Sequence, residues 1–148
     1  MDVLKSFSLQ GQVALVTGGA GLYGRQIVEA LAEAGAVTFM ASRNLAKLEE
    51  YAQELRDRGL DVTALELDLA RQESIDNTVQ EIVKRSGRFD ILINNAVNRC
   101  GCRSWDLNMD DFDESFRMNA SSLFYLTRKA SNAMREAGNG GSIVNIAS

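Results

Sequence analysis

Short apolar runs alternate along the chain with longer stretches in which apolar residues recur every three or four positions. Most of the runs are too apolar for strands with one solvated face, so they predict strands of a parallel sheet that are buried on both faces. The predicted strands are Val13–Thr17, Val37–Ala41, Val62–Leu67, Asp90–Ile93 and Ser142–Ile146. Strands that alternate with helices indicate repeated βα units, and hence the α/β class.

Four stretches carry the helical period. The first three stripes are Ile27, Val28 and Leu31; Leu45, Leu48, Ala52 and Leu55; and Ile75, Val79, Ile82 and Val83. A fourth, longer stripe, which allows a break near its start, consists of Phe112, Phe116, Ala120, Leu123, Thr127, Ala130 and Met134. A glycine follows the last periodic residue of each stripe, where a left-handed cap is expected: Gly35, Gly59, Gly87 and Gly138. No linker or repeat separates these elements, so residues 1–148 are predicted to form one domain of the order βαβαβαβαβ.

The composition fits one soluble globular domain, with 148 residues of which 45% are hydrophobic and 24% charged. The net charge is −4 and no basic stripe is present, which argues against nucleic acid as a partner. No segment approaches the length of a membrane span. We therefore expect a cytoplasmic protein that does not bind membranes.

Histidine is absent from the sequence, which excludes histidine-based triads and His-ligated metal sites from these residues. The two cysteines, Cys100 and Cys102, are too close for an ordinary disulfide and have no neighbouring Cys or His to complete a zinc site. The sequence thus predicts a reducing compartment and no metal site. Four acidic residues nearby are interpreted as charge that complements a helix dipole: Asp110, Asp111, Asp113 and Glu114.

A glycine-rich loop, Thr17-Gly18-Gly19-Ala20-Gly21-Leu22-Tyr23-Gly24, follows the first strand directly and leads into the first helix. A dinucleotide diphosphate needs backbone N–H groups at a helix N-terminus and a turn without Cβ atoms, and Gly18, Gly21 and Gly24 can supply these. The alternative is a plain glycine-rich turn between strand and helix. The strand before the loop and the helix after it favour dinucleotide binding.

This loop resembles that of the short-chain dehydrogenase/reductase family, and the resemblance covers nearly the whole chain. It continues through Asp68, Asn94-Asn95-Ala96, Asn119 and the segment 141–148. The resemblance implies a Rossmann-type, doubly wound parallel sheet of order 3-2-1-4-5 that lacks the last strands of the family fold. Two features depart from the single-domain branch of the family. The glycine spacing TGxxGxxG is that of the extended branch, and Val97 stands where glycine is usual.

The resemblance also implies which residues form the site. Ser148 and Asn119 match the catalytic positions that orient the substrate carbonyl and join a proton relay. The matching cofactor-binding residues are Thr17, Gly18, Gly19, Gly21, Leu22, Tyr23, Gly24, Ser42, Arg43, Asp68, Leu69, Asn95 and Ala96.

The end of the second predicted strand bears on the choice of cofactor. An acid there would bind the ribose 2′-OH of NAD, but Ser42 stands in that place and Arg43 follows it. Arg43 can pair with a 2′-phosphate, so NADP is preferred over NAD. The alternative is that Arg43 faces solvent before a helix capped by Asn44.

The family's proton donor is a Tyr with a Lys four residues later, and this pair follows the Ser that matches Ser148. We therefore expect the pair to be missing from these 148 residues. Tyr125 and Lys129 have the same spacing, but they precede Ser148 within the fourth helix, where packing and a solvated face explain them. The two residues are excluded from the predicted site.

The resulting hypothesis is an NAD(P)-dependent oxidoreductase that transfers a hydride between nicotinamide and a small alcohol or carbonyl substrate. The 148 residues alone are expected to be inactive. One alternative is a catalytically silent module that binds dinucleotides or protein partners, and another is an epimerase or dehydratase of nucleotide sugars. The resemblance also implies a homo-oligomer. The last predicted strand lies at a sheet edge with unpaired backbone groups, so these residues on their own are expected to aggregate or associate.

Overall fold

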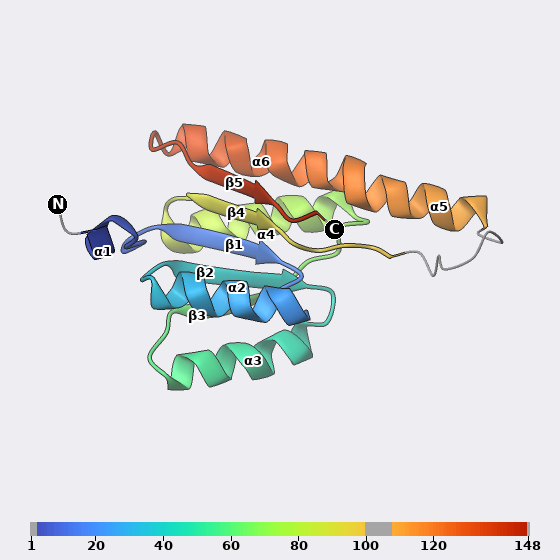
Figure 1. Cartoon of the computed structure of the whole chain (residues 1–148). Coiled ribbons are helices and arrows are strands. Elements are labelled where there is room, and N and C mark those ends of the chain that lie inside the picture. Colours follow the sequence, from blue (N-terminus) through green and yellow to red (C-terminus); the bar gives the residue numbers. More distant parts are fainter. Residues whose placement is uncertain (1–2, 100–107, 148) are drawn as a thin grey trace.

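Five strands form one parallel sheet in a computed structural model of the chain, which describes residues 3–99 and 108–147. The strands are β1 (Val13–Thr17), β2 (Val37–Ser42), β3 (Val62–Glu66), β4 (Ile91–Asn94) and β5 (Ser142–Asn145). Their order across the sheet is β3-β2-β1-β4-β5 (Figure 1). The structure thus confirms the Rossmann-type α/β fold and the order 3-2-1-4-5.

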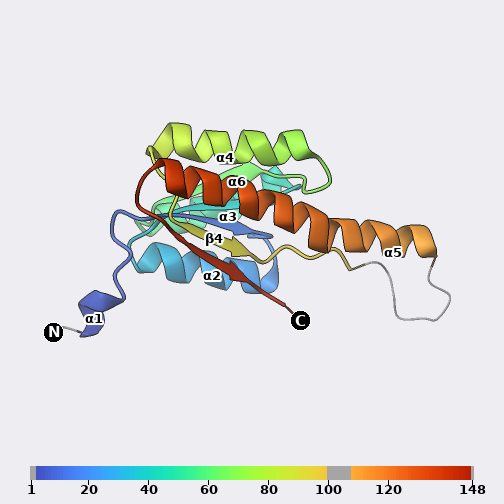
Figure 2. The ribbon, with the colours of Figure 1, turned by 90° about the horizontal axis from the view of Figure 1, so that it is seen from above.

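Helices cover both faces of the sheet (Figure 2). Helices α2 (Leu22–Glu33) and α3 (Leu45–Asp57) pack on one face, and α4 (Gln72–Ser86) and α6 (Leu123–Glu136) pack on the other. Successive side chains of a strand point to opposite faces, so β1 contributes to two cores. Leu15 packs among residues of α4 and α6, and Val16 packs among residues of α2 and α3. This two-sided burial explains why β1 is apolar at nearly every position.

Helix ends fall where the glycines predict them. Gly35, Gly59, Gly87 and Gly138 have φ values of 99°, 84°, 71° and 76°. These values lie in the left-handed region that a helix C-cap requires and that residues with a Cβ rarely adopt. The short helix α1 (Val3–Ser6) was not predicted, because a single turn contains too few positions to display a hydrophobic period.

The fourth predicted helix is continuous from α5 (Met109–Phe116) through a π-helical segment, η1 (Arg117–Ser122), into α6. The helix is therefore not broken near its start; only its hydrogen-bonding pattern changes there to that of a π-helix. The first part of the predicted apolar stripe is wrong as a core face, since Phe112 is 47% exposed and Phe116 63% exposed. The reason is that α5 extends beyond the end of the sheet, as Figures 1 and 2 show. Only α6 lies over the strands and buries its stripe.

The expectation that every strand is buried on both faces is wrong for β5. Burial on both faces holds for β1 and β4, but most of β5 is exposed. Among the described strands β5 has β4 as its only neighbour, and Ile143 is its residue that packs against the core. Its outer edge therefore presents unpaired backbone N–H and C=O groups.

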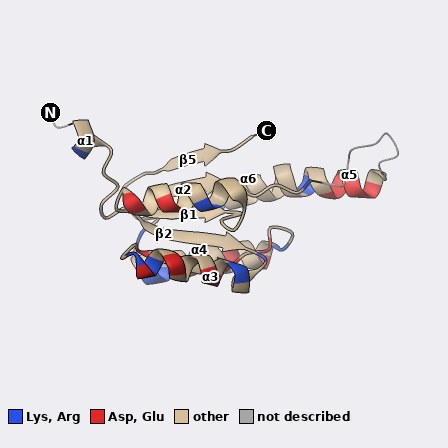
Figure 3. Cartoon of the chain, turned by 60° about the horizontal axis from the view of Figure 1, so that its bottom comes forward, with Lys and Arg blue, Asp and Glu red and all other residues tan. Residues whose placement is uncertain are grey.

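The described charged residues lie mainly in the helices, and the strands carry almost none (Figure 3). The acidic run falls at the start of α5, with Asp110 and Asp111 in the first turn. The side chain of Asn108 caps this helix by accepting a hydrogen bond from Asp110 N at 3.0 Å. Negative charge at this end complements the helix dipole, as the sequence predicts. Within residues 3–99 and 108–147, no helix is long and apolar enough to cross a membrane.

Asp90 ties three segments together at the amino-terminal end of the sheet. Its carboxylate accepts a hydrogen bond from Val13 N at 2.8 Å, two from the Arg88 guanidinium at 2.7 Å each, and another from Asn139. Burial is the largest single influence on this carboxyl and disfavours its charge. The donors outweigh burial, so the pKa of Asp90 lies below its ordinary value. Asp90 thus joins the start of β1, the start of β4 and the turn before β5.

Candidate cofactor and active site

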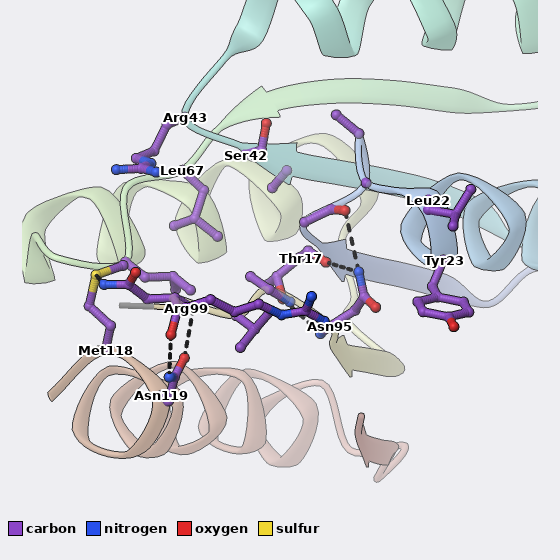
Figure 4. A pocket seen from close by; sticks show the side chains of 18 residues that line it. Thr17, Leu22, Tyr23, Ser42, Arg43, Leu67, Asn95, Arg99, Met118 and Asn119 are labelled. Atoms are coloured by element: carbon purple, nitrogen blue, oxygen red, sulfur yellow. Dashed lines mark hydrogen bonds between the residues drawn. The ribbon is translucent and has the colours of Figure 1, made fainter. Parts of the chain in front are cut away.

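A cavity of about 460 Å³ opens at the carboxyl ends of β1, β2 and β4 (Figure 4). Strand order reverses direction between β1 and β4, and open α/β sheets bind ligands at such a switch point. Ten of the predicted cofactor-binding residues line the cavity: Thr17, Gly18, Gly21, Leu22, Tyr23, Ser42, Arg43, Leu69, Asn95 and Ala96. The predicted catalytic residue Asn119 lines it too. Ser148, Cys100 and Cys102 lie outside the described residues.

Three predicted cofactor-binding residues do not line the cavity: Gly19, Gly24 and Asp68. The two glycines lie behind the turn, where there is no room for a side chain. A Cβ on Gly19 would lie 2.7 Å from Met40 Cβ, and one on Gly24 would lie 2.9 Å from Gly19 Cα. Asp68 instead accepts a hydrogen bond from Ala70 N at 3.0 Å, and its own N–H donates to Ser74 Oγ. The two glycines therefore allow the close packing of the turn, and Asp68 shapes the loop after β3.

The glycine turn leaves the N-terminus of α2 open towards the cavity. Gly18 has φ of 66°, and a Cβ there would lie 3.0 Å from Ala96 Cα. Gly21 is the N-cap of α2, and no side chain caps the helix, whereas Asn44 caps α3 and Asn108 caps α5. The first N–H groups of α2 therefore have no helical acceptor, and Leu22 and Tyr23 line the cavity. Free N–H groups at a helix N-terminus suit a diphosphate, so the residues present fit a dinucleotide.

Thr17 and Asn95 lock the ends of β1 and β4 together beneath this turn. The buried hydroxyl of Thr17 accepts hydrogen bonds from Asn95 N and Ala96 N, each at 3.0 Å. The Asn95 amide donates to the carbonyl oxygens of Thr17 at 3.1 Å and Gly18 at 3.3 Å. The glycine turn and the loop after β4 are consequently held in a fixed relation, which sets the width of the cavity floor.

Arg43 extends from the end of β2 at one side of the cavity. Its side chain is exposed, and Ser42 beside it is half-buried. Asn44 accepts a hydrogen bond from Lys47 N at 3.0 Å and caps α3, as the alternative of a solvent-facing Arg43 expects. Ser42, Arg43 and Lys47 also line an adjoining shallow hollow. Two cations and a hydroxyl thus meet where the 2′-position of an adenosine ribose is expected.

Asn119 lies in the π-helical segment and faces the loop after β4. Its Oδ1 accepts from Asn98 N at 2.8 Å, and its Nδ2 donates to Asn98 O at 2.7 Å. Ser115 Oγ donates to the same carbonyl oxygen at 3.0 Å. Figure 4 shows this pairing beside Met118. The π-helical segment gives Asn119 the position from which its amide bonds both backbone groups of one residue.

Tyr125 and Lys129 lie elsewhere. The Tyr125 hydroxyl donates to the Asp76 carboxylate of α4 at 3.1 Å, and Lys129 Nζ lies 2.9 Å from Asp76 Oδ1. The hydrogen bond from Lys129, followed by that from Tyr125, lowers the pKa of Asp76 in spite of partial burial. This cluster joins α4 to α6 and does not line the cavity.

Several lining residues were not predicted: Ala20, Ala41, Leu67, Asn98, Arg99 and Met118. Leu67, like most of these, follows no chemical pattern and lines the cavity because it stands next to a strand end. Arg99 does carry a signal, since it is a cation three residues after Asn-Asn-Ala in a loop beside the expected nicotinamide.

The sheet order and the glycine turn at its switch point define a Rossmann-type fold suited to a dinucleotide. The sequence profile described as "short chain dehydrogenase" matches residues 12–148. The chain belongs to the short-chain dehydrogenase family.

Similar proteins agree with this assignment. The 3beta-hydroxysteroid dehydrogenase 2 of Eggerthella lenta is 33% identical over 141 residues, which cover 95% of this chain and 54% of that protein. The 2-dehydro-3-deoxy-D-gluconate 5-dehydrogenase of Bacillus subtilis is 34% identical, over 97% of this chain and 55% of that one. A crystal structure of a short-chain type dehydrogenase/reductase from Mycobacterium marinum has a TM-score of 0.93 at 28% identity, covering 100% of this chain and 60% of its own. The chain thus spans about half the length of the curated relatives that it matches.

Proposed function

We propose that the protein is an NAD(P)-dependent oxidoreductase that interconverts a small alcohol and its carbonyl compound. The observation that carries this proposal is the meeting of the open α2 N-terminus, Arg43 and Asn119 around one cavity. When bound, the nicotinamide cofactor supplies or accepts the hydride. The names of the relatives, which are dehydrogenases and reductases, support hydride transfer over the epimerase alternative.

The chain's own residues bind and orient in this proposal. The N–H groups at the start of α2 receive the diphosphate, and the bonds between Thr17 and Asn95 hold the floor on which the nicotinamide end lies. Asn119 fixes the backbone of the loop after β4 and belongs to the proton path, and Ser148 orients the substrate carbonyl. Leu69 and Asp68 belong to the adenine end.

The substrate class in this proposal is a small alcohol or carbonyl compound. Relatives named for a steroid, for sorbitol and for a dehydro-deoxy-gluconate support an alcohol or ketone as the reacting group. Activity of the natural full-length protein is tested by following NADPH and NADH absorbance against a panel of ketones, aldehydes and polyols. We expect turnover of at least one substrate of the panel with one of the two cofactors. Tight cofactor binding without any turnover across the panel would favour the silent-module alternative.

NADP is proposed as the preferred cofactor, and Arg43→Ala is the variant that tests it. The variant loses one charge-assisted pair with the 2′-phosphate, so its affinity for NADPH is expected to fall about tenfold while its affinity for NADH stays unchanged. The measurement is a fluorescence titration of both reduced cofactors. Lys84→Ala is the control, because this exposed lysine of α4 lies away from the cavity. Equal loss of affinity for both cofactors would remove the 2′-phosphate role from Arg43.

A further inference from the structure

The cavity is cationic although the protein is acidic. The net charge of the chain is −4, and yet none of the described residues that line the cavity is an aspartate or glutamate. The charged residues among them are Arg43 and Arg99. Arg43 stands at the end of β2, and Arg99 stands in the loop after β4. The proposed 2′-phosphate accounts for the first of these charges and leaves the second without a role.

Arg99 is held at the rim of the cavity by its neighbour. The N–H and the C=O of Asn98 are both bonded to Asn119, and Ser115 bonds the same C=O. These bonds fix the backbone immediately before Arg99. Figure 4 shows the Arg99 side chain running from this loop along the cavity towards Asn95. The guanidinium therefore points into the cavity from a constrained backbone.

The two lining arginines also differ from the other arginines in the part of the chain that the structure describes. Arg56, Arg58, Arg71, Arg85 and Arg88 pair with carboxylates, Arg25 and Arg128 lie over aromatic rings, Arg117 donates to Ala70 O and Arg135 to Asn132. Among these described residues, Arg43 and Arg99 alone have no such partner.

An arginine without a protein partner presents five N–H donors in a planar fork. That fork matches the paired oxygens of a phosphate or a carboxylate, and it can bind them with two parallel hydrogen bonds. The described lining residues, none of which is acidic, add no repulsion to such a ligand. The chemistry that fits Arg99 is therefore an oxyanion that enters the cavity from solvent.

We propose that Arg99 forms a second anion-binding position of the cavity, taking a phosphate or carboxylate group at the β4 end. The proposal rests on the proposed function, since it assumes that this cavity is the ligand site. Two sources have the required chemistry: the diphosphate of the cofactor, and an acidic group on the substrate. Either group would bind to the Arg99 guanidinium, so the two sources are distinguished by two different ligands.

The first arm measures ADP-ribose binding to the natural full-length protein by calorimetry. ADP-ribose contains the diphosphate but neither the nicotinamide nor a 2′-phosphate. If the diphosphate is the source, Arg99→Ala lowers the affinity for ADP-ribose about tenfold and leaves the affinity for adenosine unchanged. Arg99→Lys then retains part of the affinity for ADP-ribose. Lys84→Ala is the matched control for loss of a surface charge, and thermal melting checks that each variant is folded.

The second arm compares 4-oxopentanoate with its methyl ester as substrates. If the substrate is the source, Arg99→Ala raises KM for the acid about tenfold, without raising KM for the ester, and ADP-ribose binding stays at the wild-type value. Unchanged ADP-ribose binding together with an unchanged preference between acid and ester overturns the anion position. Failure of the wild-type protein to bind ADP-ribose overturns the proposed function itself, so the two failures are distinguishable.

Discussion

Gly24→Ala is expected to lower NADPH affinity roughly a hundredfold, the largest effect on binding that we expect from a single methyl group. The added Cβ would lie 2.9 Å from both Gly18 C and Gly19 Cα, and closer still to the Gly18 carbonyl oxygen. Backbone atoms cannot rotate away as a side chain can, so α2 or the glycine turn must shift. Either shift moves the open helix N-terminus relative to the cavity floor that Thr17 and Asn95 hold.

The test is a fluorescence titration with NADPH together with thermal melting of the variant. Gly87→Ala is the control, because this glycine lies at the other end of the sheet, with φ of 71° and open space around its Cβ position. Gly87→Ala is expected to lower stability by about 1 kcal/mol and to leave NADPH affinity unchanged. Wild-type affinity in Gly24→Ala would contradict the role of close packing between α2 and the turn.

Asp90→Asn is expected to lower the free energy of unfolding by about 3 kcal/mol, which corresponds to a fall of roughly 6–12 °C in Tm. The carboxylate is nearly fully buried and accepts from Val13 N, Arg88 and Asn139. An amide in its place offers one oxygen instead of two and turns a donor towards Arg88. The urea midpoint and the Tm measure the loss, and Asp61→Asn, at an exposed position, is expected to stay within about 0.5 kcal/mol of the wild type.

The same carboxylate predicts a pH dependence. The folded-state pKa of Asp90 is lowered, so its contribution to stability is fully present above the ordinary carboxyl pKa of about 4. That contribution is lost as the pH falls from there through the lower folded-state pKa. Urea unfolding at pH 7 and at about pH 3 should therefore show a smaller difference between wild type and Asp90→Asn in acid. An equal difference at both pH values would show that the charge of Asp90 does not stabilise the fold.

Much of the fold was predictable because burial on two faces leaves a plain signal. Strands such as β1 are apolar at nearly every position, and the left-handed glycines mark where helices end. The exposure of Phe112 and Phe116 was not predictable, since the period of a helix reports which residues share a side and says nothing about whether a sheet lies beneath them. The exposure of β5 likewise depends on what lies beside the strand.

The candidate site was predictable where backbone geometry demands a residue type. Gly18 and Gly24 are such positions, because a Cβ would meet backbone atoms. The sequence does not distinguish glycines that line the cavity from those that pack behind the turn, such as Gly19 and Gly24. Arg99 was missed although a cation in the loop after Asn-Asn-Ala is a sequence signal, because its lack of a partner among the described residues depends on the whole fold.

The π-helical segment η1 has an evolutionary consequence. A π-helical turn holds one residue more than the α-helix it interrupts, so one inserted codon can create it and one deleted codon can remove it. Each residue in an α-helix turns the chain by about 100°. Deleting one residue between Arg117 and Ser122 would return this segment to the α-helical period, which would move Asn119 relative to the helices on either side and break its bonds to Asn98. A single insertion into a plain α-helix is therefore enough to create the π-helical turn that holds Asn119 beside the cavity.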